Sequence, residues 1–337
     1  MKVMKTAKKI GLTIMLPVVT YLFFLILCNA TGHPGFGVGE DLKTIIYGAV
    51  YSTMIAQAMS INLQTGRFDF AMGATLVLSG ITGGLLTQQL NFGPVMMMVT
   101  IMVMGIIIGL ISGVVYVSLK LPPMVISIGL AMIYEAVGFM ISTQGVNLIG
   151  RTDVLVFARF PYNLILMLVV LVILVIVYDY TKIGYNRKAL QGGQKIAVDV
   201  GVKEKKNAVW CYAIAGALLA LGAVVYLSKF GKIAPATGLG SSAYFMNAFL
   251  PMFIGAIFAK HSSQPIAIFM GGIVQACLDS GLARMNVSTS LTTVINGVIV
   301  CAFLIYSSNV YKIEEVERFK AKLARAVADK KERTTSE

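Results

Sequence analysis

The chain has 337 residues, of which 57% are hydrophobic and only 13% are charged. Soluble domains carry about 45–50% apolar and about 25% charged residues. This composition, with a mean hydropathy of +0.80, therefore excludes a typical water-soluble enzyme and indicates a membrane protein. The net charge of +13 would suit a nucleic-acid partner in a soluble protein, but in a membrane protein it can reflect orientation instead.

Apolar runs of about 20 residues, the length that crosses a bilayer, recur along the whole chain. The sequence predicts an all-α polytopic membrane protein with about ten transmembrane helices, some of them broken. The predicted spans are 10–28, 44–63, 68–87, 94–118, 121–142, 163–180, 207–228, 243–260, 264–281 and 289–309. Polar residues interrupt the second, third and eighth of these spans.

The distribution of lysine and arginine predicts the orientation of these spans. With the N-terminus inside and ten spans, 22 cations fall on the cytoplasmic side and six on the outer side, as the positive-inside rule requires. Both termini are therefore predicted to be cytoplasmic. A short N-terminus (1–9) would precede a transmembrane domain (10–309), and a basic and acidic helical tail (310–337) would follow it. Because orientation accounts for the charge, no nucleic-acid partner is expected.

One predicted cytoplasmic loop, 181–206, is long, basic and rich in glycine. Helix-forming residues from Gln194 to Val200 stand between Gly192-Gly193 and Gly201, which are turn or helix-stop signals. The loop is therefore predicted to contain a short helix that lies across the cytoplasmic face.

Sequence motifs for nucleotide hydrolysis, metal binding or serine-nucleophile catalysis are absent from the chain. The four cysteines show no disulfide or zinc spacing. We therefore expect no catalytic residue, no metal site and no cofactor. Small residues spaced by four, as in Gly105, Gly109 and Gly113, favour close helix packing. A polytopic protein of this kind is most often a transporter or channel.

Polar groups at membrane depth are costly and mark candidate solute paths. The residues predicted to line such a path are Gln57, Asn62, Asp69, Tyr134 and Asn247. In the alternative interpretation these side chains only satisfy one another between packed helices. Asp69 could likewise cap the third span, whereas Glu135 lies in the middle of the fifth span.

Four blocks of the sequence resemble the permease subunits of ABC importers for ribose, other monosaccharides and related solutes. The run TGRFDFAMG (65–73) is similar to that family's GGIDLSVG, and LPPMVISIG (121–129) is similar to LPPFIVTLG. The segment 184–201 resembles the family's cytoplasmic loop, and the segment 238–272 resembles its glycine-containing block. The resemblance covers nearly all of 40–310. Arg67 replaces a glycine of the first block, and such departures leave the particular sugar open.

The resemblance implies a permease subunit of the cell (plasma or inner) membrane that pairs with a second permease subunit, identical or not. An extracytoplasmic binding protein would deliver the solute, and cytoplasmic ATPase subunits would bind and hydrolyse ATP. The expected ATPase-coupling residues lie in the short cytoplasmic helix and its flanking glycines. They are Gly192, Gly193, Gln194, Ile196, Ala197, Val200 and Gly201. Ala197 is expected to sit against the ATPase because its side chain is small.

The expected solute is neutral and polar, most simply a monosaccharide, with nucleosides or polyols as alternatives. A different class, an ion-coupled secondary transporter, would use Asp69 or Glu135 as its coupling group. A membrane-embedded enzyme would have only His261 and scattered aspartates to offer.

Overall fold

The computed structural model describes residues 2–259 and 262–305, and these residues form mainly α-helices. The helices are α1 (Lys2–Ala30), α2 (Glu40–Leu63), α3 (Met72–Gln89), α4 (Pro94–Leu119), α5 (Pro123–Ile141), α6 (Tyr162–Tyr180), α7 (Lys182–Gly192), α8 (Gln194–Asp199), α9 (Glu204–Phe230), the 3-10 turn η1 (Gly240–Ser242), α10 (Ala243–Met246), α11 (Phe249–Phe258) and α12 (Gln264–Arg284). A further helix covers Thr289–Ile305. Two short strands, β1 (Val146–Asn147) and β2 (Lys232–Ile233), pair antiparallel.

Within the described residues, eight helical segments are long and apolar enough to cross a membrane, and Thr289–Ile305 is a shorter apolar helix. The prediction of an all-α polytopic membrane protein is therefore confirmed, and each predicted span overlaps a helix within the described residues. α3 is not among the eight. Most of its residues are buried against α4, α5 and α9, so it presents little surface to lipid. The predicted tail (310–337) lies outside the described residues.

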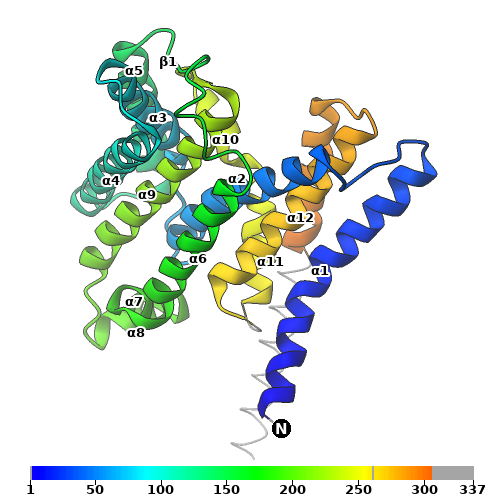
Figure 1. Ribbon diagram of the computed structural model, residues 1–337. Helices are drawn as coiled ribbons and strands as arrows, with labels where there is room; N and C mark the ends of the chain where they lie inside the picture. The colour runs from blue at the N-terminus through cyan, green and yellow to red at the C-terminus, as the bar shows by residue number, and fades with distance from the viewer. Residues whose placement is uncertain (1, 260–261, 306–337) are drawn as a thin grey trace, which may run out of the picture.

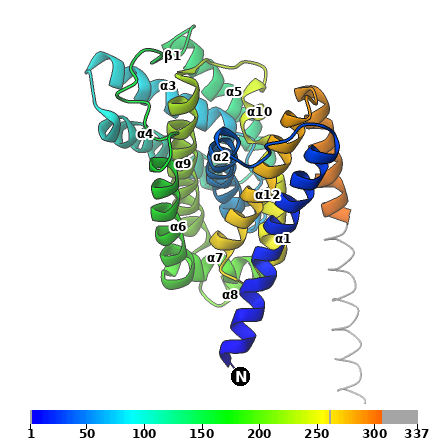
Figure 2. The same cartoon turned by 45° about the vertical axis from the view of Figure 1, so that its right-hand side comes forward.

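The N-terminal end of α1 lies at the same end of the molecule as α7 and α8, and β1 lies at the opposite end (Figures 1 and 2). This arrangement agrees with the expectation that the N-terminus and the loop 181–206 share one side. We call the α7–α8 end the cytoplasmic end, following the predicted topology.

Helices α4 and α9 pack against each other through glycine. A Cβ at Gly105 would overlap the carbonyl oxygen of Gly216, and a Cβ at Gly109 would overlap that of Tyr212. Any side chain at these positions would force the backbones apart. The predicted role of this glycine series in close packing is therefore confirmed.

Two predicted spans are broken in the structure. α3 begins at Met72 and not at residue 68, because 64–71 form a turn in which Gly66 has a φ of 79°. The Asp69 carboxylate accepts the backbone N–H of Ala71 at 2.8 Å in the turn before α3. Ala71 is the N-cap residue of α3 and no side chain caps the helix there, so Asp69 stabilises the turn and does not cap α3 as the capping interpretation expected. The eighth span is divided into η1, α10 and α11, with Leu239 in the left-handed region (φ 65°) just before η1.

Candidate functional site

A cavity of about 480 Å³ lies near the outer ends of α2, α9 and α12, beside the broken eighth span. Aromatic side chains dominate its lining: Tyr47, Tyr51, Tyr226, Phe230 and Tyr244. Tyr226 is at the centre of this group, since its ring centroid is 4.5 Å from that of Phe230, 5.1 Å from that of Tyr244 and 5.8 Å from that of Tyr51. A concave, largely aromatic surface with few polar groups is typical of a small-molecule site.

The few polar groups of this cavity include Asn247 and Asp279. Asn247 is exposed, so its amide is available to a solute. The Asp279 carboxylate is fixed by the amide of Gln275, at 2.9 Å and 3.0 Å to its two oxygens, and by the amide of Asn296 at 3.0 Å. A carboxylate oriented in this way keeps acceptor capacity for a further hydroxyl group.

Of the five predicted path residues, Asn247 lines this cavity and the others lie elsewhere. The Gln57 amide donates to the carbonyl of Pro265 at 2.8 Å. The Tyr134 hydroxyl is 2.8 Å from the Ser112 hydroxyl in the α4–α5 contact. Both side chains are buried and make a contact between packed helices, as the alternative interpretation expects, while the side-chain oxygen of Gln57 has no partner among the described residues.

The turn between α2 and α3 contains buried polar groups whose hydrogen-bonding capacity is not used. Both amide atoms of Asn62, and Nε and Nη2 of Arg67, are buried without a hydrogen-bond partner among the described residues. Arg67 is only 2% exposed. Leaving such groups unpaired is costly, and the side-chain oxygen of Gln57 is buried without a partner as well.

Glu135 has a clear structural partner. Its two carboxylate oxygens accept the backbone N–H groups of Leu239 and Ser241, each at 2.9 Å. The Glu135 side chain, which extends from α5, therefore stabilises the start of the broken eighth span. The backbone there is not helical, so its N–H groups need other acceptors.

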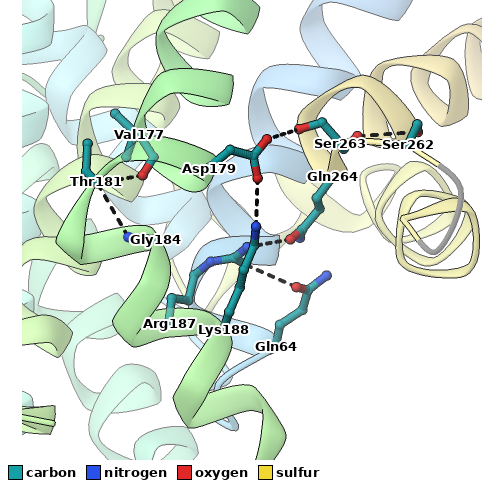
Figure 3. A network of polar contacts seen from close by, with 10 residues as sticks. All are labelled: Gln64, Val177, Asp179, Thr181, Gly184, Arg187, Lys188, Ser262, Ser263 and Gln264. Carbon is teal, nitrogen blue, oxygen red and sulfur yellow. Dashed lines mark hydrogen bonds and ion pairs between the residues drawn. The ribbon is translucent and has the colours of Figure 1, made fainter.

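A buried arginine connects the cytoplasmic helix α7 to the transmembrane bundle (Figure 3). The Arg187 guanidinium donates to the side-chain oxygen of Gln64, at the end of α2, at 3.0 Å and to that of Gln264, at the start of α12. It also lies over the ring of Tyr178 on α6, 4.2 Å from the centroid. Arg187 is 1% exposed, so α7 is fixed to three helices through one desolvated group.

A second, more exposed contact lies beside this one. Lys188 forms an ion pair with Asp179 at 2.7 Å, and Asp179 also accepts the Ser263 hydroxyl at 2.7 Å (Figure 3). The Lys188 and Asp179 side chains are 49% and 28% exposed, so solvent screens the pair.

The short helix predicted between Gln194 and Val200 is present as α8, and Gly193 and Gly201 have φ values of 158° and 97°. Its apolar side chains point in two directions. Ile196 is 69% exposed and Val200 is 76% exposed, whereas Ala197 is 3% exposed. The methyl group of Ala197, which was expected to sit against the ATPase, packs inside the chain itself, so Ile196 and Val200 are the exposed apolar residues here.

The outer loops are held by a different arginine. Arg151 donates to the Asn91 side chain at 2.6 Å and to the Phe92 carbonyl at 3.0 Å, which joins the loop before α6 to the α3–α4 turn. Its hydrogen bond to Asp153 lowers the pKa of that carboxyl below the usual value. Arg151 thus joins two outer loops through charge-assisted hydrogen bonds.

Sequence reasoning missed the aromatic cavity and the Arg187 contact. The spacing of Tyr47 and Tyr51, and of Tyr226 and Phe230, would place each pair on one helix face, so a signal for the cavity was present. Arg187 gave no such signal, because it is one of seven cations in a loop expected to be solvated.

The chain forms a helical bundle with a cavity at its outer end and with cytoplasmic helices anchored to it. Together these features are typical of a multi-pass transport component of the inner (plasma) membrane. The chain belongs to the family described as branched-chain amino acid transport system / permease component, which matches residues 42–304.

Similar proteins include the fructose import permease protein FruG of Bifidobacterium longum, which is 21% identical over 86% of this chain and 90% of its own length. The ribose import permease protein RbsC of Bacillus subtilis is 23% identical over 83% of this chain and 88% of its own length. The L-arabinose transport system permease protein AraH of Escherichia coli is 23% identical over 92% of each chain. Sugar import permeases are thus similar to this chain over most of its length.

Proposed function

We propose that this chain is the permease subunit of an ATP-driven importer and forms the translocation path for a neutral monosaccharide. The observation that carries the proposal is the cytoplasmic pair α7–α8, which exposes Ile196 and Val200 outside the bundle while Arg187 fixes the pair to α2, α6 and α12. An apolar helix surface exposed to the cytoplasm fits a groove on a partner protein. Motion of such a partner would reach three transmembrane helices through one buried side chain.

In this proposal ATPase subunits dock on α8 and supply the ATP chemistry, for which this chain carries no sequence motif. A second permease subunit completes the path, and an extracytoplasmic binding protein docks at the outer end. The chain itself would need no cofactor.

The outer cavity supports a sugar as the solute. The apolar C–H faces of a pyranose or furanose ring can stack on Tyr226 and its aromatic neighbours, while Asn247 and Asp279 offer hydrogen bonds to hydroxyl groups. The names of the similar permeases, which include fructose, ribose and L-arabinose import, point to the same solute class. Nucleosides and polyols share these features and are the nearest alternatives.

An ion-coupled secondary transporter is less well supported. Both carboxylate oxygens of Glu135 and one oxygen of Asp69 already accept backbone N–H groups that hold broken helix ends. A group that binds and releases an ion during each cycle would have to give up these contacts.

Ile196→Asp tests the docking surface. The introduced charge would be desolvated against the ATPase, so co-purification of the ATPase subunit and solute uptake should both be lost while the permease still inserts. Ile196→Val keeps an apolar side chain at the same position and should retain both. Unchanged co-purification and uptake in Ile196→Asp would refute α8 as the docking surface.

Uptake of a panel of labelled sugars, nucleosides and polyols, in cells with and without this gene, tests the solute. Uptake that continues after ATP depletion, while a proton gradient is held, would refute the ATP-driven mechanism in favour of the secondary transporter.

A further inference from the structure

A cavity of about 580 Å³ opens at the cytoplasmic end, where the start of α7 faces the start of α9. Three of its lining residues are lysines: Lys182 on the α7 side, and Lys203 and Lys206 on the α9 side. All three are exposed, and none forms an ion pair within residues 2–259 and 262–305. The lining of the cavity therefore carries three positively charged side chains and no negatively charged one.

Two acids lie near these lysines in the sequence, Asp199 and Glu204, and neither lines the cavity. The Glu204 carboxylate accepts the Gln194 amide at 2.6 Å, on the α8 side. The frame of the cavity is fixed, because the buried Asn207 amide donates to the Ile183 carbonyl at 3.1 Å and thereby ties α9 to α7. Two helix N-termini, which favour anions, also open here at Lys182 and Glu204.

The only tryptophan of the chain, Trp210, lines the same cavity and is 49% exposed. Lys206 and Trp210 are four residues apart and so lie on one face of α9, and Lys203 is the N-cap residue of that helix. α9 is one of the membrane-spanning segments, and tryptophan at the end of such a helix marks the headgroup level of the bilayer. The lysines of the cavity therefore lie at the depth of lipid phosphates.

We propose that this cavity, which we call the basic interfacial pocket, binds the phosphate headgroup of an anionic phospholipid. Lys182, Lys203 and Lys206 would contact the headgroup, and Trp210 would pack against the upper part of its acyl chains. Basic pockets between transmembrane helices on the cytoplasmic side are suited to such lipids. Because the pocket adjoins α8, its lipid would stabilise the loop that carries the proposed docking surface.

Trp210 itself provides the assay, since its fluorescence reports on this pocket alone in the purified full-length chain. The chain is reconstituted in phosphatidylcholine bilayers that contain a fixed fraction of brominated phosphatidylglycerol or, separately, of brominated phosphatidylcholine. Bromine quenches tryptophan on contact, so stronger quenching by phosphatidylglycerol measures enrichment of the anionic lipid next to Trp210. A lysine at the bilayer surface contributes about fivefold in affinity for anionic lipid, and we expect a clear excess of quenching.

Lys203→Gln/Lys206→Gln should abolish that excess. The matched control, Lys195→Gln/Lys205→Gln, removes the same charge from exposed residues of the same loop that do not line the pocket, and it should keep the excess. Equal quenching by the two brominated lipids, or an excess that survives Lys203→Gln/Lys206→Gln, would overturn the proposal. Loss of the excess when millimolar inorganic phosphate is added would overturn it in favour of a soluble anion.

Discussion

Replacing Arg187 should weaken the joint between the cytoplasmic helices and the bundle far more than replacing its neighbour Lys188. Arg187→Ala removes two hydrogen bonds from a charged donor and leaves the oxygens of Gln64 and Gln264 without that donor. Each such bond contributes about 1.5–3 kcal/mol, so a loss of at least about 3 kcal/mol in the free energy of unfolding is expected. The exposed Lys188–Asp179 pair is worth about 0–1 kcal/mol.

Thermal unfolding of the purified chain in detergent measures this difference. At roughly 2 °C per kcal/mol for a chain of this size, Arg187→Ala should lower the melting temperature by about 6 °C and Lys188→Ala by about 2 °C or less. Equal shifts for the two variants would refute the reasoning, because they would show that the buried and the exposed contact contribute alike.

Arg187→Lys separates coupling from folding. An ammonium group is a point charge that cannot span both glutamine oxygens as the planar guanidinium does, so α7 should stay attached to one helix and lose the other. In proteoliposomes with the ATPase subunits, solute transported per ATP hydrolysed should fall several-fold while ATP hydrolysis continues. An unchanged ratio in Arg187→Lys would mean that the two glutamine contacts do not transmit the motion.

Three further changes test other parts of the structure. Glu135→Gln replaces one acceptor oxygen with an amide donor that faces a backbone N–H, so it should lower the free energy of unfolding by about 2–3 kcal/mol, measured as a lower melting temperature; an unchanged value would contradict the contact. Gly109→Val should prevent folding, which would be seen as aggregation in size-exclusion chromatography. The control Gly93→Ala, in which the new methyl group meets open space, should elute as the parent protein does. A monodisperse Gly109→Val variant would contradict the packing of α4 against α9. Cysteines introduced at 155 and 196 should label from opposite sides of the membrane, and labelling from one side would refute the topology.

The sequence predicted well those features that depend on residues close together in the chain. Run length and hydropathy placed the helices, and the Gly192-Gly193 and Gly201 signals located α8 within a residue of its observed end. The glycine series of α4 predicted a close contact, because a helix repeat puts Gly105 and Gly109 on one face. The start of α3 was missed by four residues, since the turn that delays it depends on hydrogen bonds within 62–71 that hydropathy does not register.

The site was harder to predict because its members come from distant parts of the chain. Tyr51 and Tyr244 are 193 residues apart, yet the Tyr51 hydroxyl donates to the Tyr244 carbonyl at 3.2 Å. Polarity was the criterion for path residues, so it selected Gln57 and Tyr134, whose polar atoms serve helix contacts, and it passed over the aromatic wall. Of the five predicted path residues, only Asn247, which lies at a helix break, lines the cavity.

The anchoring of Glu135 has a consequence for how the protein is made. The two N–H groups that its carboxylate accepts belong to residues 104 and 106 positions later in the chain. At about 5–20 residues per second of synthesis, α5 waits about 5–20 s in the bilayer before its partners Leu239 and Ser241 exist. During that interval the Glu135 carboxyl lacks both of these hydrogen-bond donors, and an ionisable side chain in lipid without partners is costly. The packing of α5 in the bundle is therefore completed only when the last third of the chain has been synthesised. Ribosome-bound fragments that end before residue 239 should be substrates for membrane proteases.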